Sequence, residues 1–464
     1  MRYKIDYEKR IKELIDREDK SYTYYIETMG CALNENDSMK YAGILEEMGF
    51  AKETDINKAN VVVFNTCCIR ENAEDKLFGR LGLLKSRKIG NKDMFIAIVG
   101  CMTEQGHILD KIKSSYSFVD VVLGTKSMQY FAEKLYIAIK DRKKTQEVQQ
   151  NEHEIIEDVP IRYDEGYKAS ISIIYGCNNF CSYCIVPYVR GRERSRRPED
   201  ILKDVKEVAK RGYKEITLLG QNVNSYGNDF KDMTFTFVDL LTQIEELEGI
   251  EVIRFVSPHP KDFTDSLIEK IAESKKIAKQ IHLPLQSGST KVLEAMNRRY
   301  TKEHFLNLVD RIRNKIPQVS FSTDIIVGFP GETEEDFLDT MDVVNKVRFD
   351  QIYMFCYSIR RGTRAEKMEN QIDEKIKVQR LERLKKLFEQ IIDEENEKKI
   401  GKVENILVEG VSKNNPKMYT GRTLDNKVVI FEGIMQDIGK IKKVEIIKNN
   451  KWYLTGKIIQ DIIK

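Results

Sequence analysis

The sequence predicts an α/β protein with three folded parts: an N-terminal open parallel α/β domain, a central partial (β/α)6 barrel and a C-terminal small antiparallel β-barrel. Two stretches of short apolar strands alternate with amphipathic helices, which is typical of parallel sheets. After Gly401 the pattern changes to five short alternating strands with Gly and Asn turns, which indicates a β-barrel of the oligonucleotide-binding style. At 464 residues the chain is also too long for a single hydrophobic core.

Changes in composition predict where these parts begin and end. The first 20 residues are charged throughout and indicate a helical extension, whereas large apolar side chains are scarce around residues 141–157. Apolar residues at helical spacing between Ala365 and Ile400 predict one long amphipathic helix that leads away from the barrel. The predicted parts are an N-terminal extension (1–20), the α/β domain (21–140), a linker (141–161), the central barrel (162–395) and the β-barrel (396–464).

Three predicted strands of the first domain each end in a cysteine. These are Cys31, Cys67 and Cys101, which lie 36 and 34 residues apart, one strand–helix unit each time. Because successive strands of an open parallel sheet have their carboxyl ends at one edge, three thiolates from distant positions can meet there. Three separately buried cysteines are the alternative, and the equivalent positions favour a joint site.

The second stretch has six predicted strands, from ASISIIYGC to QIYMFCYS, too few for a closed eight-stranded barrel. Cys177, Cys181 and Cys184 follow its first strand with the spacing C-x3-C-x2-C. Three thiolates hold three corners of a four-iron cluster and leave the fourth iron open. A zinc site with a borrowed ligand is the alternative, but no Cys or His follows within the next 70 residues.

The composition indicates a cytoplasmic protein with no membrane segment. The N-terminus lacks the apolar region of a signal peptide, and no apolar run approaches the roughly 20 residues that span a membrane. Eight cysteines in such a chain favour metal or redox chemistry over disulfides. From Gly401 onward, 12 Lys+Arg face 7 Asp+Glu, and residues 190–197 carry five Arg against Glu193. This charge fits a polyanion such as nucleic acid and solvated surface lysines about equally well.

The run GCNNFCSYC resembles the signature of the radical S-adenosylmethionine (radical-SAM) enzymes, in which an aromatic residue, here Tyr183, precedes the last Cys. The resemblance implies a TIM-like radical-SAM barrel and a [4Fe-4S] cluster held by Cys177, Cys181 and Cys184. It also implies that S-adenosylmethionine binds the open iron and is cleaved to a 5′-deoxyadenosyl radical, which abstracts hydrogen from a C–H bond.

The order of the three parts resembles a narrower family, the methylthiotransferases, over nearly everything after residue 20. They carry an N-terminal three-cysteine domain, a radical-SAM partial barrel and a C-terminal TRAM domain. The resemblance implies that Cys31, Cys67 and Cys101 hold an auxiliary [4Fe-4S] cluster that carries the transferred sulfur. One S-adenosylmethionine then methylates this sulfur, and a second one supplies the radical.

Five local runs resemble the branch of this family that acts on isopentenyl-adenosine in tRNA; they span residues 65–82, 176–196, 282–289, 324–337 and 421–429. This implies methylthiolation of carbon 2 of N6-isopentenyl-adenosine, just 3′ of the anticodon, in tRNAs that read codons beginning with U. The implied partners are the tRNA anticodon stem-loop and an electron donor such as flavodoxin or ferredoxin, and the enzyme is expected to be a monomer.

Two alternatives stay open. A sister enzyme of the family modifies threonylcarbamoyl-adenosine in tRNA, and another modifies an aspartate of a ribosomal protein. A non-catalytic iron–sulfur RNA-binding protein would explain the basic β-barrel but not a three-cysteine site with an open iron.

The chain departs from the family's pattern at a few positions. Cys68 stands where the family usually has a smaller residue, and we expect it to point away from the site. Cys356 is expected in the core. Arg361 and Arg364 replace common prolines and add charge that could meet tRNA phosphates.

Other residues carry weaker signals. Thr333 is expected to cap a helix, since three acidic residues follow it. His282 is interpreted as a satisfied core residue. Glycines in 218–227 and 326–333 either admit the cofactor or make ordinary turns. The arginines of 190–197 either bind phosphates, which we favour, or pair with surface carboxylates.

Overall fold

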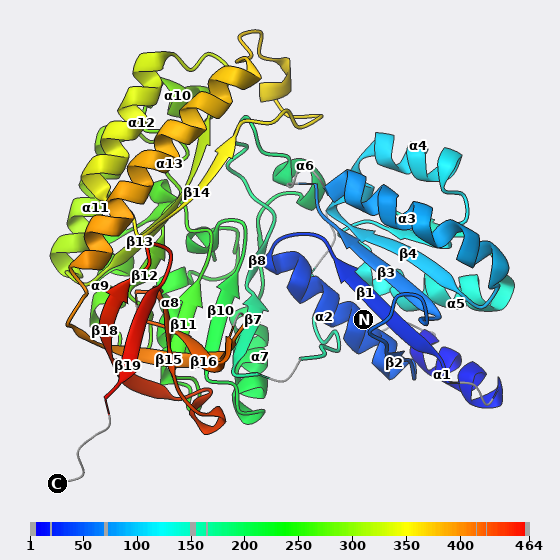
Figure 1. The fold of residues 1–464 in the computed structure, drawn as a ribbon. Coiled ribbons are helices and arrows are strands. Elements are labelled where there is room, and N and C mark those ends of the chain that lie inside the picture. Colours follow the sequence, from blue (N-terminus) through cyan, green and yellow to red (C-terminus); the bar gives the residue numbers. More distant parts are fainter. Residues whose placement is uncertain are drawn as a thin grey trace. The chain divides into compact units, whose positions relative to one another are not determined.

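The computed structural model describes residues 6–18, 21–68, 73–148, 155–163, 166–413, 415–423 and 425–459 (Figure 1). The chain forms two compact units. The first comprises Met1–Phe180, Cys184–Lys203 and Leu219–Gln221, and the second comprises Cys181–Tyr183, Asp204–Leu218 and Asn222–Lys464. In the described part of the chain, no helix is both long and apolar enough to cross a membrane.

The first unit is built on a six-stranded sheet in the order β2-β1-β3-β4-β5-β6, and every pair in it is parallel. The predicted open parallel α/β domain is therefore confirmed. The segment that was expected to be a linker contributes the edge strand β6. The strands are β1 (Thr23–Thr28), β2 (Ala51–Lys52), β3 (Val61–Thr66), β4 (Phe95–Gly100), β5 (Val121–Leu123) and β6 (Thr145–Glu147).

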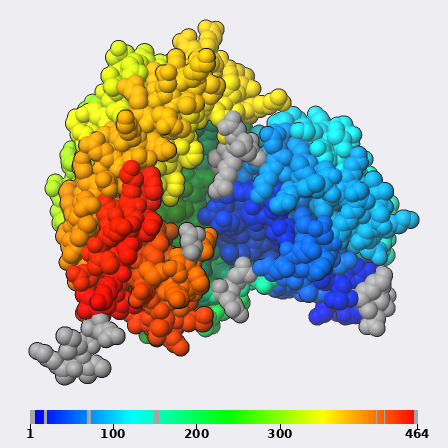
Figure 2. Space-filling view, viewed as in Figure 1, coloured from blue at the N-terminus to red at the C-terminus, as the bar shows by residue number. Residues whose placement is uncertain are grey.

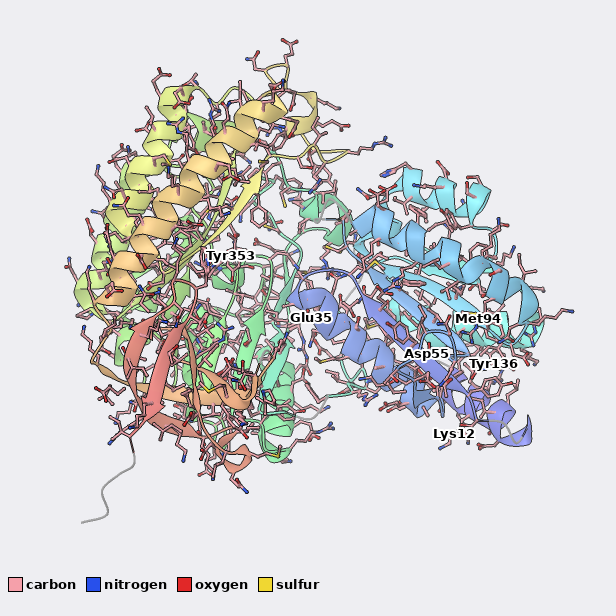
Figure 3. The ribbon with its side chains drawn as sticks, in the orientation of Figure 1. Lys12, Glu35, Asp55, Met94, Tyr136 and Tyr353 are labelled. Atoms are coloured by element: carbon pink, nitrogen blue, oxygen red, sulfur yellow. The ribbon has the colours of Figure 1, made fainter. Side chains whose placement is uncertain are left out.

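Helices cover both faces of this sheet. Alternate residues of β3 show why: Val61 and Val63 pack with α1, α2 and α5, whereas Val62 and Phe64 pack with α3 and α4. Tyr136 of α5, labelled in Figure 3, contacts Tyr7 of α1 with ring centroids 5.6 Å apart. The helices are α1 (Tyr7–Glu18), α2 (Ala32–Glu47), α3 (Ala73–Gly90), α4 (Gly106–Ser115) and α5 (Phe131–Asp141).

A hairpin and a short helix complete the first unit. Strand β7 (Lys168–Ser172) is followed by β8 (Ile174–Tyr175), which pairs antiparallel with β9 (Arg194–Ser195). The segment between β8 and β9 contains the C-x3-C-x2-C run and α6 (Val186–Arg190). Helix α7 (Pro198–Lys210) begins in the first unit and ends in the second.

In the second unit, β10 (Glu215–Leu219) pairs with β11 (Val252–Phe255), and β12 (Gln280–His282), β13 (Ser320–Val327) and β14 (Gln351–Cys356) form a second parallel group. Together with β7 they are the six strands expected of the partial barrel.

The helices are α8 (Phe237–Glu246), α9 (Asp265–Glu273), α10 (Thr290–Ala295), α11 (Lys302–Lys315), α12 (Glu334–Val347) and α13 (Glu374–Glu397). The 3-10 helices of both units are η1 (Cys101–Glu104), η2 (Met128–Tyr130), η3 (Val223–Ser225), η4 (Pro260–Asp262), η5 (Ala365–Lys367) and η6 (Met435–Asp437).

Helix α13 confirms the predicted long helix but not its expected direction. It packs on α12, β13 and β14 through an apolar stripe that includes Leu384, Phe388 and Ile391. It also contacts β18 (Ile441–Asn449) of the C-terminal barrel. In the surface view the orange and red barrel residues lie directly against this helix (Figure 2). The expectation that the helix leads away from the barrel was wrong, because its apolar stripe is buried on the sheet.

The C-terminal barrel is closed and has the five predicted strands, in the order β15-β16-β17-β19-β18. Its core contains Val429, Phe431 and Val444. Four pairs are antiparallel, but β17 and β19 are parallel, so the barrel is not wholly antiparallel. The strands are β15 (Val403–Ser412), β16 (Asn415–Arg422), β17 (Val428–Glu432), β18 (Ile441–Asn449) and β19 (Leu454–Ile458).

Thr333 caps α12, as its sequence predicted. Its hydroxyl accepts a hydrogen bond from the Asp336 backbone N–H, and the Asp336 carboxylate accepts one from the Thr333 N–H. Burial alone would raise the pKa of Asp336, but hydrogen bonds from Lys291 and Ser289 outweigh it and hold this pKa well below its usual range.

Replacing Asp336 by Asn is expected to lower the free energy of unfolding by about 1 kcal/mol at pH 7, since the ion pair with Lys291 is lost and the hydrogen bonds to the carboxylate lose its charge. Because the folded carboxylate has a depressed pKa, its stabilisation is present above the unfolded pKa of about 3.9 and is lost as the pH falls below it. Denaturant unfolding at pH 7 and pH 3.5 measures this. A difference between the two proteins that does not shrink at the lower pH would contradict it.

Candidate active site

The three strand-end cysteines of the first unit lie at neighbouring strands, as predicted. Cys67 directly follows β3, Cys101 directly follows β4 and opens η1, and Cys31 stands immediately before α2, three residues beyond β1. Strands β1, β3 and β4 are adjacent and parallel, so their carboxyl ends share one edge of the sheet.

Two glycines allow the backbone to approach closely at this edge. A Cβ at Gly30, just before Cys31, would lie 3.0 Å from Cβ of Cys67 and 2.8 Å from the Asn34 side chain. Gly100, just before Cys101, has φ +100°, and a Cβ there would lie 2.5 Å from the Thr66 carbonyl oxygen. Both Gly-Cys pairs are therefore a sequence signal of close packing between the cysteine loops.

Buried polar side chains fix these loops. Asn34 is fully buried, and its amide donates to Asn65 Oδ1 at 3.1 Å and to the Thr66 carbonyl at 2.9 Å. Its Oδ1 lies 3.6 Å from the Cys31 thiol. Asn65 in turn donates to the Asn34 carbonyl and to Ser38. This network holds Cys31 in position against the end of β3.

A buried arginine reaches this edge from α6. Arg190 Nε donates to Cys101 Sγ at 3.1 Å, and its Nη2 donates to Asn34 and to Asp37, each at 3.1 Å. The Arg190 side chain is only 6% exposed. A buried cation next to a thiol favours the thiolate, which is the form that binds iron. Sequence reasoning missed this role, because Arg190 belongs to a run of charges that resembles a surface loop.

Cys68 does not point away from the site, and that expectation was wrong. It is buried in a cluster with Cys101, Ile185 and Val189. The hydrogen bond between Cys68 and Cys101, together with Arg190, lowers the pKa of Cys101 to about 7 against the opposing effect of burial. The same hydrogen bond and burial raise the pKa of Cys68 well above its usual value. Within this pair the proton is therefore held more firmly by Cys68 than by Cys101.

The radical-SAM-like run begins with a tight turn. Gly176 has φ +78°, and a Cβ there would lie 2.0 Å from the Arg192 carbonyl oxygen. Cys177 N–H donates to the Gly191 carbonyl at 3.1 Å. Cys177 is buried and Cys184 half-buried, and both belong to the first unit.

Cys181 belongs to the second unit, where it lies at the carboxyl end of the barrel strands. The neighbouring Ser182 donates through its N–H to the Met296 carbonyl and accepts from the Ala365 N–H. The ring of Tyr183 packs against Phe329, just beyond β13, with centroids 6.5 Å apart. This is the end at which barrel enzymes bind their ligands.

A second buried arginine contacts this cysteine. Arg298 is 5% exposed, and its Nη1 lies 3.5 Å from Cys181 Sγ. Its Nη2 donates to the Pro284 carbonyl at 3.1 Å, and its Nε donates to the Tyr300 hydroxyl at 3.1 Å. Tyr300 is held in turn by the carbonyls of Pro284 and Leu285. Each cysteine set thus has one thiol next to a buried guanidinium.

The residues present fit iron–sulfur clusters in their chemistry. Both sets supply thiols at strand carboxyl ends, and each set has one thiol next to a buried guanidinium. Within the described residues, no three His, Cys, Asp or Glu side chains converge closely enough to hold a single metal ion. The assignment of each cysteine as a ligand therefore remains a prediction.

Of the five arginines between residues 190 and 197, two are buried, Arg194 is half-buried and two are exposed. Arg190 is buried as described, and Arg196 pairs with Glu157 and donates to the Ser172 carbonyl at 2.8 Å. The prediction that these arginines bind phosphates was therefore wrong for Arg190 and Arg196. Arg192 and Arg197 are exposed.

His282 lies on β12 in a polar contact network. Its Nδ1 is 3.0 Å from Ser322 Oγ, its Nε2 is 3.3 Å from Asp324, and its ring packs edge-on against Tyr353. It is thus satisfied, as expected, although it is only half-buried. Cys356 is half-buried rather than part of the core, and Arg361 and Arg364 are exposed.

Three family models match the chain in sequence order. The model of the uncharacterized protein family UPF0004 matches residues 23–124, the radical SAM superfamily matches 171–344, and the TRAM domain matches 397–459.

Relatives that match over nearly their full length identify the family more narrowly than these three models do. A protein of Acetivibrio thermocellus named tRNA-2-methylthio-N(6)-dimethylallyladenosine synthase is 49% identical over 454 residues, which cover 97% of this chain and 94% of the relative. The chain belongs to this synthase family. A synthase of Thermoanaerobacter pseudethanolicus is 46% identical over 98% of this chain and 97% of its own length, and one of Clostridium botulinum is 47% identical over 98% and 99%.

Solved structures support the fold of this synthase family member. The radical S-adenosylmethionine methyltransferase TsrM of Kitasatospora setae, with cobalamin and a [4Fe-4S] cluster bound, superimposes with a TM-score of 0.54 at 15% identity, covering 75% of this chain and 77% of TsrM. Apo OxsB, a cobalamin-dependent S-adenosylmethionine radical enzyme, gives a TM-score of 0.53 at 13% identity, covering 82% of this chain and 57% of OxsB. At these identities the similarity concerns the fold alone.

Proposed function

We infer that this chain is a radical-SAM methylthiotransferase that modifies tRNA. It transfers a methylthio group to carbon 2 of N6-isopentenyl-adenosine, next to the anticodon on its 3′ side, in tRNAs that read codons beginning with U. The observation that carries this inference is the 46–49% identity, over nearly the whole chain, to synthases of that name. Its cofactors are S-adenosylmethionine and [4Fe-4S] clusters.

We propose that Cys177, Cys181 and Cys184 hold the cluster at which S-adenosylmethionine is cleaved. Their C-x3-C-x2-C spacing supports this assignment, as does the place of Cys181 at the carboxyl end of the barrel strands. Arg298 contacts the Cys181 thiol and helps to hold it in position. The bound cluster and S-adenosylmethionine supply the radical chemistry, and the protein positions them.

We propose that Cys31, Cys67 and Cys101 hold a second, auxiliary cluster, with one S-adenosylmethionine used as methyl donor and another as radical source. Their place at three adjacent strand ends supports a shared site, and so do the close packing at Gly30 and the guanidinium of Arg190. Cys68 hydrogen-bonds to Cys101 but is not itself a ligand in this proposal.

We also propose three functional parts at 21–140, 162–395 and 396–464, each of which contains one matched family model. The tRNA is bound through its anticodon stem-loop. The electron donor is a flavodoxin or ferredoxin, the active species is a monomer, and the enzyme works in the cytoplasm.

Mass spectrometry of tRNA nucleosides tests the proposal in a strain that lacks this protein. The 2-methylthio form of isopentenyl-adenosine is expected to disappear, and the unthiolated isopentenyl-adenosine is expected to accumulate in its place. Persistence of the first, with loss of another methylthio nucleoside, would move the assignment to a sister enzyme. Re-expression of the gene should restore the lost nucleoside.

A further inference from the structure

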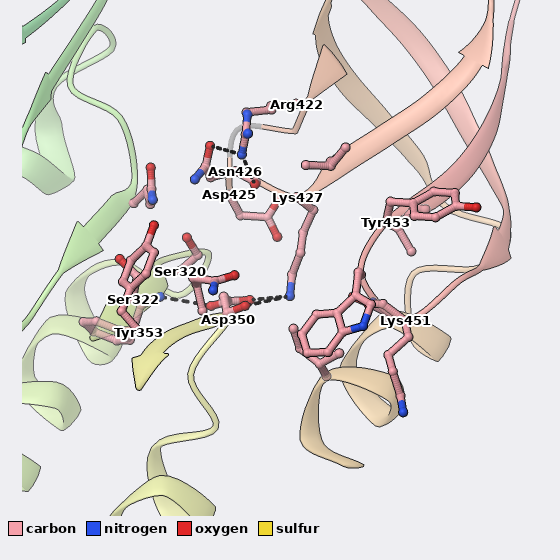
Figure 4. A pocket seen from close by; sticks show the side chains of 18 residues that line it. Ser320, Ser322, Asp350, Tyr353, Arg422, Asp425, Asn426, Lys427, Lys451 and Tyr453 are labelled. Atoms are coloured by element: carbon pink, nitrogen blue, oxygen red, sulfur yellow. Dashed lines mark hydrogen bonds and ion pairs between the residues drawn. The ribbon is translucent and has the colours of Figure 1, made fainter. Parts of the chain in front are cut away.

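A cavity of about 260 Å³ lies within the second unit, between the C-terminal barrel and the amino ends of β13 and β14 (Figure 4). It is far larger than the roughly 30 Å³ share of one water molecule, and slightly smaller than the roughly 300–1000 Å³ sites of drug-sized ligands. Its size therefore suits a single small polar group, such as one nucleotide's base.

Two buried polar atoms of its wall have no hydrogen-bond partner among the described residues. They are Asn396 Oδ1 and Ser320 Oγ, on side chains that are 2% and 3% exposed. The Asn396 amide nitrogen is already used, since it donates to the Lys451 carbonyl at 2.7 Å. Because these two atoms expose almost no surface, they do not face the open cavity, and a bound molecule would be recognised by the exposed side chains of the lining.

Aromatic rings also line the cavity. Trp452 is 53% exposed although it packs against Phe388 of α13, and Tyr353 of β14 is 49% exposed. Figure 4 shows Tyr353 and Tyr453 on opposite sides, with Lys427 reaching across to Asp350. Exposed aromatic faces next to polar groups suit stacking with a nucleobase.

Two basic side chains, Arg422 and Lys427, also line the cavity. Arg422 bonds to Glu409 and Asn426 through Nε and Nη1, which leaves its Nη2 without a partner in the described part of the chain. Lys427 is 3.4 Å from Asp350, a loose pair. A guanidinium with a free edge fits a phosphate group, and Arg422 and Lys427 belong to the run GRTLDNK that the sequence singled out.

The cavity lies at the opposite end of β13 from the cysteine-bearing loop. Ser320 is the first residue of this strand, and Val327 is its last. Phe329, two residues beyond Val327, packs against Tyr183 of the cysteine-bearing loop. Seven residue steps of about 3.3 Å separate the strand ends by roughly 23 Å. A nucleotide in this cavity is therefore not the nucleotide being modified.

We propose that this cavity binds one unpaired nucleotide of the substrate tRNA other than the modified adenosine. Its base stacks on Trp452, and its phosphate pairs with Arg422. Because the central barrel and the C-terminal barrel both line the cavity, both contact the RNA. This rests on the proposed function, because it takes tRNA as the substrate.

Trp452 is the only tryptophan of the chain, so the holoenzyme reports on this cavity without any mutation. Titration with full-length tRNA that carries isopentenyl-adenosine is expected to change its fluorescence. In fluorescence anisotropy with the same tRNA, labelled, Trp452→Leu and Arg422→Gln are expected to weaken binding about fivefold or more, whereas Trp452→Phe, which keeps a ring, is expected to bind nearly as wild type. Arg422→Gln should also lower the slope of log affinity against log salt by about 0.7–0.9.

Lys417→Gln is the matched control, because Lys417 is an exposed cation on β16 outside the cavity. It should bind tRNA within about twofold of wild type. Unchanged Trp452 fluorescence at saturating tRNA, with wild-type binding by every variant, would overturn the proposal and leave a water-filled cavity. In that outcome the wild-type enzyme still methylthiolates the tRNA. If the proposed function itself is wrong, the wild-type enzyme neither binds nor modifies it.

Discussion

Replacing Cys181 by Ala is expected to abolish the cleavage of S-adenosylmethionine, whereas replacing Cys101 by Ala is expected to preserve this cleavage and abolish methylthio transfer. The two thiols belong to different sets, and each set is expected to hold its own cluster. Anaerobically reconstituted protein should contain about eight irons, and either variant about four. Chromatography of 5′-deoxyadenosine after dithionite reduction measures cleavage, and mass spectrometry of tRNA nucleosides measures transfer.

Cys68→Ala is the matched control for the first prediction, because it removes a buried thiol that hydrogen-bonds to Cys101 without removing an expected ligand. It should keep about eight irons and measurable methylthio transfer. If Cys68→Ala loses as much iron as Cys67→Ala, then Cys68 is a ligand and the assignment of this set must change.

Replacing Arg190 by Met is expected to destabilise the first unit by about 3 kcal/mol, because it leaves the half-buried carboxylate of Asp37 without its cation. The side chain is 6% exposed, so solvent screens the lost pair little. Iron retention should fall as well, since Arg190 also donates to Cys101 Sγ. Denaturant unfolding of the apoprotein measures the first effect, and iron released to a chelator over time measures the second.

The double variant Arg190→Met with Asp37→Asn separates these two effects. It removes the unpaired charge, so stability should partly recover, whereas the contact with Cys101 stays lost and iron should still leave quickly. Arg192→Met is the control, because Arg192 is exposed and a surface change usually alters stability by less than about 0.5 kcal/mol. If Arg190→Met unfolds with the same free energy as wild type, the ion pair with Asp37 contributes nothing to stability.

The sequence predicted the strand-end cysteines because local patterns determine them. A strand pattern that ends in Cys reports both the element and its end, and adjacent parallel strands bring those ends together. The helix cap at Thr333 is equally local, since three residues suffice to specify it. These features do not depend on what packs on them from elsewhere in the chain.

The two arginines next to the cysteines could not be predicted in this way. Arg298 is 117 residues from Cys181 and Arg190 is 89 residues from Cys101, and only tertiary packing brings them together. In the sequence, Arg190 resembles its exposed neighbours. Cys68 was misplaced for a related reason: strand alternation assigns it to the side opposite Cys67, but the strand ends at Thr66 and the chain bends at Cys68.

The parallel pairing of β19 with β17 has a consequence for the synthesis of the protein. The last strand, Leu454–Ile458, lies between β17 and β18, so the ring of the C-terminal barrel stays open until that strand has left the ribosome. Cys184, the last of the six expected cluster ligands, emerges 270 residues earlier. At about 5–20 residues per second, this gap lasts roughly 14–54 s. Iron–sulfur delivery can therefore begin on the nascent chain, well before the RNA-binding barrel closes.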